Sequence, residues 1–171
     1  MIEIKTADQL ADPGLEARWA ARRNTPEADV LRAVLREFVQ RAGPVSVGDI
    51  LAALPGQAPI AVRDRLARLD ADDLIQLDDD RVEVAYPFSA RPSGFVARLA
   101  RGHDRFCCCA IDALGIAPMV RQPVRIRAGC HQSGSLLELS VTPEGPGPEC
   151  RDVLVWVGRR GEGDRRATEF L

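Results

Sequence analysis

The stretch Phe106–Gly115 reads FCCCAIDALG and places a carboxylate three residues after the last of three consecutive cysteines. We expect a helix over residues 105–116, ended by Pro118. On that helix Cys109 and Asp112 share one face. A thiolate near a helix N-terminus has a lowered pKa, and a carboxyl in apolar surroundings keeps its proton. The pair is therefore suited to binding a soft metal and protonating a group attached to it.

The other thiols of this region have different expected positions. Cys108 shares a face with Asp112, four residues away, whereas Cys107 lies on another side of the helix. A second cysteine-containing turn, AGCHQSG, follows at residues 128–134 with Cys130 inside it. A buried helix in which cysteine replaces alanine fits the first stretch equally well, because free cysteines are commonly buried. Spacing alone leaves the functional and the structural interpretation open.

Composition limits the classes of protein to consider. A chain of 171 residues with 46% hydrophobic and 28% charged residues is typical of one large or two small globular domains. No apolar run approaches the ~20 residues that span a bilayer, and Met1–Lys5 lacks the features of a signal peptide. We therefore expect a cytoplasmic protein without a membrane partner.

The cysteine and histidine counts exclude two further classes of site. Five cysteines, three of them adjacent, do not make a disulfide framework. There is no CxxC pair and no Cys/His spacing typical of structural zinc. His103 and His131 are the two histidines of the chain, which disfavours a site built on histidine.

The N-terminal half predicts a winged-helix-like unit. Residues 1–24 form an arm or short helix, and residues 25–88 form the unit itself. Its expected elements are a helix after Pro26, a short helix capped by Ser46, a helix over 59–70 with Ile60, Val62, Leu66 and Leu69 inward, and a hairpin of strands 74–77 and 81–86.

A winged helix raises the question of DNA binding. Arg63, Arg65 and Arg68 on the third helix would be the residues that read the bases. Residues 26–88, however, hold 7 Lys and Arg against 12 Asp and Glu, a net charge of −5. Because phosphate neutralisation supplies most of the affinity for DNA, we expect no nucleic-acid partner and a structural or substrate-shielding role instead.

Residues 89–171 predict an α+β domain. Alternating apolar residues indicate strands over 95–99, 124–128 and 136–141, and an apolar run indicates a buried strand over 153–157 with Trp156 in the core. The predicted fold is therefore α+β: a winged-helix-like three-helix unit with a hairpin, packed on a small antiparallel sheet that carries the cysteine helix.

Four segments resemble the alkylmercury (organomercurial) lyase family. They are CAIDAL at 109–114, PVRI at 123–126, GCHQSG at 129–134 and LSVTP at 139–143. The resemblance extends over roughly residues 84–157, and the winged-helix-like unit before it also suits the family. The cysteine helix followed by the cysteine-containing glycine turn is the more specific part of the resemblance.

The resemblance implies cleavage of a carbon–mercury bond by protonation. Cys109 would be the thiolate that attacks the organomercurial and holds the mercury, and Asp112 would relay the proton to the departing carbon. Cys130 falls on the family's structural cysteine. The family needs no organic cofactor; mercury enters with the substrate, and cellular thiols or a mercuric reductase would accept the product ion.

A further functional cysteine of the family has two placements here. Cys150 provides it if the preceding loop is shortened. Alternatively, residues 153–158 form the strand that precedes it and the sequence ends at Leu171 before reaching it, as in a shortened or truncated member. Cys107 or Cys108 would then supply the second thiolate.

Two other functions stay open from the sequence. One is a non-catalytic protein that binds soft Hg or Cu ions through its thiols, and the other is a different lyase or isomerase reaction on the same scaffold. Arg125, Arg127 and Arg151 either guide an anionic substrate or form the solvated side of their strands.

Overall fold

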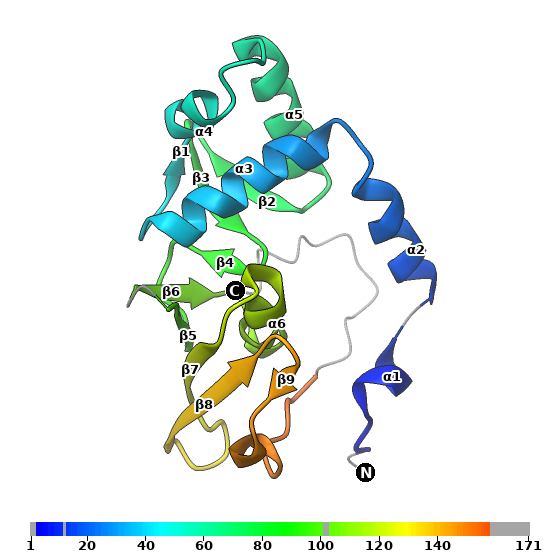
Figure 1. Cartoon of the computed structure of the whole chain (residues 1–171), viewed down its shortest axis with the longest axis vertical. Coiled ribbons are helices and arrows are strands. Elements are labelled where there is room, and N and C mark those ends of the chain that lie inside the picture. The colour runs from blue at the N-terminus through cyan, green and yellow to red at the C-terminus, as the bar shows by residue number, and fades with distance from the viewer. Residues whose placement is uncertain (1–2, 12, 101–102, 158–171) are drawn as a thin grey trace.

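A computed structural model describes residues 3–11, 13–100 and 103–157 of the chain. Within these ranges, six α-helices and nine strands form an α+β fold, as the sequence predicted (Figure 1). The strands build one antiparallel sheet in the order β1-β3-β4-β6-β5-β7-β8-β9, and β2 pairs with β3. None of the helices in the described ranges is long and apolar enough to cross a membrane.

The three helices predicted for residues 25–71 are present, and residues 1–24, predicted as an arm or a short helix, hold two short helices. In chain order they are α1 (Ala7–Leu10), α2 (Pro13–Arg22), α3 (Glu27–Gln40), α4 (Val47–Ala53) and α5 (Pro59–Ala71). Ser46 caps α4, because its hydroxyl accepts the backbone N–H of Asp49 at 3.1 Å. Ile60 was wrongly predicted to face inward and is 69% exposed. It lies two residues, or about 200° of helix rotation, before the buried Val62.

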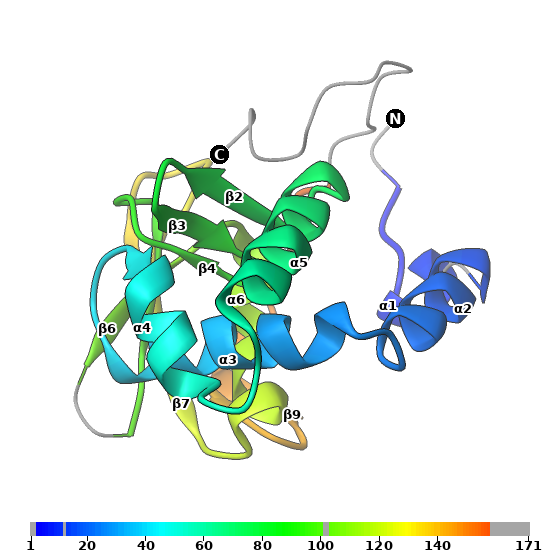
Figure 2. The same ribbon diagram turned by 90° about the horizontal axis from the view of Figure 1, so that it is seen from above.

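The predicted hairpin is present and belongs to the same sheet as the C-terminal strands. β1 (Val45–Ser46), β2 (Ile75–Asp78) and β3 (Arg81–Ala85) lie beside the helices (Figure 2). β4 (Phe88–Ser89) then pairs with β3 on one side and with β6 (Asp104–Cys107) on the other. The sheet is thus continuous across residue 88, and the domain boundaries proposed from the sequence stay predictions.

The C-terminal half continues the sheet and carries one helix on it. The strands are β5 (Phe95–Arg98), β7 (Val124–Gly129), β8 (Leu136–Thr142) and β9 (Gly145–Pro146), and the helix is α6 (Ala110–Val120). Side chains alternate along β5 and β7, so that the buried Ala97 and Ile126 share one face. The buried residues Ala113 and Ile116 of α6 belong to the same core as these strand residues.

The cysteine stretch divides into a strand and a helix, which corrects the single helix predicted over 105–116. β6 ends at Cys107 and α6 begins at Ala110. The first half of the stretch is a strand because it fills the place between β4 and β5 in the sheet. Pro118 does not end α6, which continues to a left-handed Arg121 with φ of 54°. A proline in the last turn removes a backbone donor without unwinding the helix here.

Residues 153–157 form no strand, which corrects the predicted buried strand. Leu154 is 68% exposed and Trp156 is 72% exposed, so Trp156 is not part of the core. An apolar composition that favours strands shows only that a segment can pack in a sheet. It does not show that a neighbouring strand is present to pair with it. In the part of the chain that the structure describes, no strand pairs with this segment.

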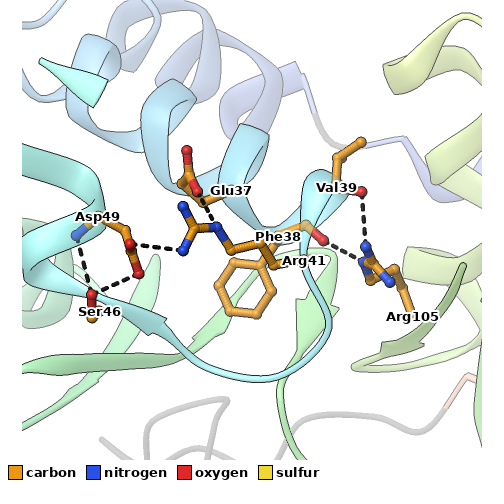
Figure 3. A network of polar contacts seen from close by, with 7 residues as sticks. All are labelled: Glu37, Phe38, Val39, Arg41, Ser46, Asp49 and Arg105. Atoms are coloured by element: carbon orange, nitrogen blue, oxygen red, sulfur yellow. Dashed lines mark hydrogen bonds and ion pairs between the residues drawn. The ribbon is translucent and has the colours of Figure 1, made fainter. Parts of the chain in front are cut away.

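A buried arginine ties β6 to the end of α3 (Figure 3). Arg105 is 4% exposed and donates to the main-chain oxygens of Phe38 and Val39, the latter at 3.0 Å. Both carbonyls lie in the last turn of α3, where intrahelical donors are lacking. The Phe38 ring stacks on Phe88 of β4 with centroids 6.0 Å apart. Because Arg105 lies two residues before Cys107, these contacts position the strand that leads into the thiol cluster.

Arg41 links the same end of α3 to α4. Its guanidinium bonds Glu37 at 2.8 Å and Asp49 at 2.7 Å, and Asp49 also accepts the Ser46 hydroxyl at 2.7 Å (Figure 3). The Ser46 hydroxyl and the Arg41 guanidinium both hold the pKa of Asp49 below its usual value. The end of α3 is therefore held on both sides by arginines.

Candidate active site

Cys109 is the N-cap residue of α6. Its backbone is extended, with φ of −152° and ψ of −179°, and its Sγ accepts the backbone N–H of Asp112 at 3.4 Å. Serine and threonine usually hold this position, with a side-chain oxygen as the acceptor. The side chain of the N-cap residue faces the third residue of the helix. The CAID sequence therefore places the Asp112 carboxylate beside the Cys109 thiol.

Cys109 and Asp112 form a hydrogen-bonded pair. The thiol donates to Oδ2 of Asp112 at 2.9 Å, and both side chains are half-buried. Burial raises the pKa of Cys109, and the hydrogen bond to Asp112 raises it further, whereas the N–H of Asp112 acts in the opposite direction. Burial also raises the pKa of Asp112, opposed by its hydrogen bonds with Cys109. The site thus holds a protonated thiol against a carboxyl that readily takes up a proton.

The lowered pKa expected for Cys109 was wrong in direction. The backbone N–H groups at the helix N-terminus do lower the pKa of Cys109, but burial and the neighbouring carboxylate outweigh them. The raised pKa expected for Asp112 agrees in direction with its burial.

The two cysteines before the pair are buried in different surroundings. Cys107 is 0% exposed, and burial raises its pKa to about 12. Cys108 donates its thiol proton to the Phe88 carbonyl at 3.3 Å, and burial raises its pKa strongly. Cys108 also lines a cavity of about 150 Å³ whose other walls come from β2, β3, β4 and residues 91–93. It therefore contacts a space that Cys109 and Asp112 do not line.

The remaining cysteines lie in turns. Cys130 opens a turn closed by Gly134, whose N–H donates to the Cys130 carbonyl at 2.8 Å. A hydrogen bond from Ser133 is the main cause of a lowered pKa at Cys130. Cys150 ends a short 3₁₀ helix (Pro148–Cys150) beside β8, and burial raises its pKa.

No metal cluster is formed by these side chains. Within the described ranges, no three His, Cys, Asp or Glu side chains gather closely enough to hold a metal ion. The structure brings Cys109 and Asp112 together and leaves the other cysteines in separate environments. The pair therefore provides one soft metal ligand, the sulfur of Cys109, and one proton acceptor, the carboxylate of Asp112.

The arginines considered from the sequence are mostly paired. Those of α5 bond to neighbours: Arg63 to Asp80, Arg65 to Gln57 and Arg68 to Glu27. Arg127 pairs with Asp104 at 2.6 Å, whereas Arg125 and Arg151 are exposed.

Two features of the site were missed from the sequence. The first is the cap: CAID has the capping-box spacing, with Cys and Asp in place of the usual Ser or Thr and Glu, and that spacing was a readable signal. The second is the anchor Arg105, whose acceptors lie 66 and 67 residues away in the sequence. No local pattern announces such a contact.

Comparisons with known proteins concern the family and the fold. Residues 88–170 match the family model described as alkylmercury lyase. The fold is similar to a solved structure titled "Crystal structure of the mercury-bound form of MerB2", with a TM-score of 0.60 and 20% sequence identity, over 71% of this chain and 58% of that one. The chain thus spans about 58% of the length of that structure, and at this identity the likeness concerns the fold. No curated protein matches the chain. The resemblance to the alkylmercury lyase family that the sequence predicted is therefore confirmed over residues 88–170.

Proposed function

We propose that this chain cleaves carbon–mercury bonds in the manner of an organomercurial lyase, with Cys109 as nucleophile and mercury ligand and Asp112 as proton relay. The observation that carries the proposal is the 2.9 Å hydrogen bond from the Cys109 thiol to the Asp112 carboxylate at the start of α6. The family match over residues 88–170 supports the same reaction class.

In the first proposed step, the sulfur of Cys109 bonds to the mercury of a substrate R–Hg–X, and the ligand X leaves as an anion. The S–H bond breaks and its proton passes to Oδ2 of Asp112, which already accepts it in a hydrogen bond. A soft metal displaces a thiol proton even where the pKa of the thiol is raised, because the metal–thiolate bond replaces it. The pair therefore keeps its proton until the substrate arrives.

In the second proposed step, Asp112 delivers that proton to carbon. The C–Hg bond breaks, and its electron pair forms the new C–H bond, so that a hydrocarbon leaves and Hg(II) stays on the Cys109 sulfur. A raised pKa suits Asp112 to this transfer, because burial favours the protonated carboxyl that forms in the first step. No organic cofactor enters either step.

Release of Hg(II) needs a second thiolate. Cys150 is the candidate that reaches solvent without opening the core, whereas Cys107 and Cys108 are buried. A small cellular thiol, or a mercuric reductase, is the proposed acceptor of the ion. A cytoplasmic setting, where thiols are abundant and reduced, fits this need.

The test is hydrocarbon release from a phenylmercuric salt in the presence of excess free cysteine, with benzene measured by gas chromatography. Wild-type protein should release benzene, and Cys109→Ser should lose that release. Ser135→Ala is the control, since it changes an exposed serine outside the Cys109–Asp112 pair, and should keep it. Unchanged release by Cys109→Ser would overturn the proposal. Tight Hg(II) binding without any benzene would instead assign a soft-metal-binding function.

A further inference from the structure

The face of the sheet opposite α6 carries three arginines on two neighbouring strands. Arg98 of β5 lies directly across from Arg125 of β7, and Arg127 is the next residue of β7 on the same face. Arg98 and Arg125 are exposed, and Arg127 is half-buried. Like charges directly opposite each other on a sheet are destabilising. The position of these side chains therefore calls for a compensating negative charge.

Asp104 bonds to two of the three arginines, and Glu138 of β8, directly across from Arg127, adds a second negative charge that acts on Arg98. Asp104 of β6 accepts from Arg98 at 2.7 and 3.2 Å and from Arg127 at 2.6 Å. Both of its oxygens are thus occupied, and the hydrogen bond from Arg98 holds its pKa below the usual range. Asp104 therefore holds the guanidinium groups of Arg98 and Arg127 in place.

The side chain of Arg125 forms no hydrogen bond or ion pair with the described residues. Its cross-strand neighbours are Arg98 on one side and Ser140 of β8 on the other. The Nε of Arg127 is also buried without a hydrogen-bond partner. The guanidinium donors of the exposed Arg125 are therefore available on a face where Arg98 and Arg127 are already oriented by Asp104.

These groups line a hollow of about 280 Å³. Arg98, Arg125 and Arg127 form its basic side, and Glu138 and Ser140 of β8 complete it. The volume lies just below the range of typical small-molecule sites. It therefore suits a ligand with one oxyanion group and a few further atoms. A nucleic acid or a protein surface would need a broader contact area.

We propose that this hollow binds a small oxyanion, a carboxylate or a phosphate, through the guanidinium of Arg125 with Arg98 and Arg127 around it. The site is separate from Cys109 and Asp112, because it lies on the face of the sheet that α6 does not cover. Serine at position 140 supplies a hydroxyl donor at the rim.

The experiment is calorimetric titration of the full chain with sodium phosphate and, separately, with sodium malonate, at constant ionic strength set by sodium chloride. At least one of the two anions should bind with a dissociation constant in the millimolar range or below. Arg125→Gln should weaken that binding at least tenfold. Arg81→Gln is the matched control, because it removes the same charge from an exposed position of β3 and should leave binding unchanged.

Glu138→Gln sharpens the test, since it removes an acid from the hollow and should tighten binding. Phosphate binding alone assigns a phosphate ligand, and malonate binding alone assigns a carboxylate. The proposal is overturned if neither anion binds below about 50 mM, or if Arg125→Gln binds as the wild type does. Benzene release is expected to be equal in all these variants, so the result does not depend on the proposed lyase activity.

Discussion

Cys109 and Cys130 both accept backbone N–H groups in tight local structures, yet their pKa values shift in opposite directions. At Cys130 a hydroxyl and two N–H groups stabilise the thiolate, and nothing negative opposes them. At Cys109 burial and the Asp112 carboxylate outweigh the same kind of N–H donation. The proposed nucleophile, Cys109, is therefore the thiol with the higher pKa, and it lies beside a carboxylate that can accept its proton. The contributions to the lower pKa of Cys130 include no carboxylate.

The largest expected effect comes from removing the acceptor. Asp112→Asn should lower hydrocarbon release by about 10²–10⁴-fold, the range for loss of general acid–base catalysis. It should also lower the pKa of Cys109, because the carboxylate that raises it is gone. Alkylation of Cys109 by iodoacetamide, followed by mass spectrometry against pH, should therefore move to lower pH. Release at the wild-type rate, or a move to higher pH, would contradict this account.

The next effect concerns Arg105, which anchors β6, the strand that leads to Cys109. Arg105→Ala should destabilise the chain by about 2–3 kcal/mol, the cost of leaving the acceptors of charged hydrogen bonds unpaired in a buried place. The urea midpoint measures it, and Arg105→Lys should recover part of the loss. Arg81→Ala, at an exposed position, should stay within about 0.5 kcal/mol of wild type. Equal destabilisation by both alanine variants would exclude an anchoring role.

A smaller effect is the order of alkylation among the thiols. At pH 7.5 Cys130 should react with iodoacetamide roughly tenfold faster than Cys109, because reaction follows the thiolate fraction. Cys107 and Cys108 should react last, since they are buried. The rate at Cys130 should reach half its maximum below the pH of an ordinary thiol, and the rate at Cys109 above it. If Cys109 reacts before Cys130, the opposite pKa shifts of the two thiols are wrong.

The smallest effect tests the hydroxyl at the second thiol. Ser133→Ala should raise the pKa of Cys130, because the hydrogen bond from Ser133 is the main cause of its lowering. Alkylation of Cys130 at pH 7.5 should slow by roughly three- to tenfold. Ser135→Ala is the control, since Ser135 contacts Cys130 through its carbonyl. The two variants should differ in the rate of Cys130 alkylation. Identical rates would show that the Ser133 hydroxyl does not lower the pKa of Cys130.

Much of the fold followed from local patterns. The α3–α5 helices and the hairpin have capping and periodic signals of their own, such as Ser46 before α4. The strands β5, β7 and β8 alternate in hydrophobicity. The cysteine stretch misled because its first half takes its conformation from two neighbouring strands, β4 and β5. Residues 153–157 misled because a strand also requires an edge to pair with.

The candidate site was predictable in composition and only partly in chemistry. The CAID spacing brings Cys109 and Asp112 together through the cap of α6, which is a local rule. The sign of the Cys109 pKa shift depends on burial by the sheet and cannot be read from three residues of spacing. The Arg105 contact and the arginine face depend on strand order, which no local pattern contains.

The two-residue strand β4 has a mechanical consequence. Two residue pairs join it to β3 and two join it to β6, so the halves of the sheet meet along a narrow seam. Cys107 and Cys108 lie at that seam, against Phe88. A local opening of the sheet at β4 would expose both thiols to reagents. The rate at which a bulky disulfide reagent labels Cys107 and Cys108 thus measures how often the sheet opens at the seam.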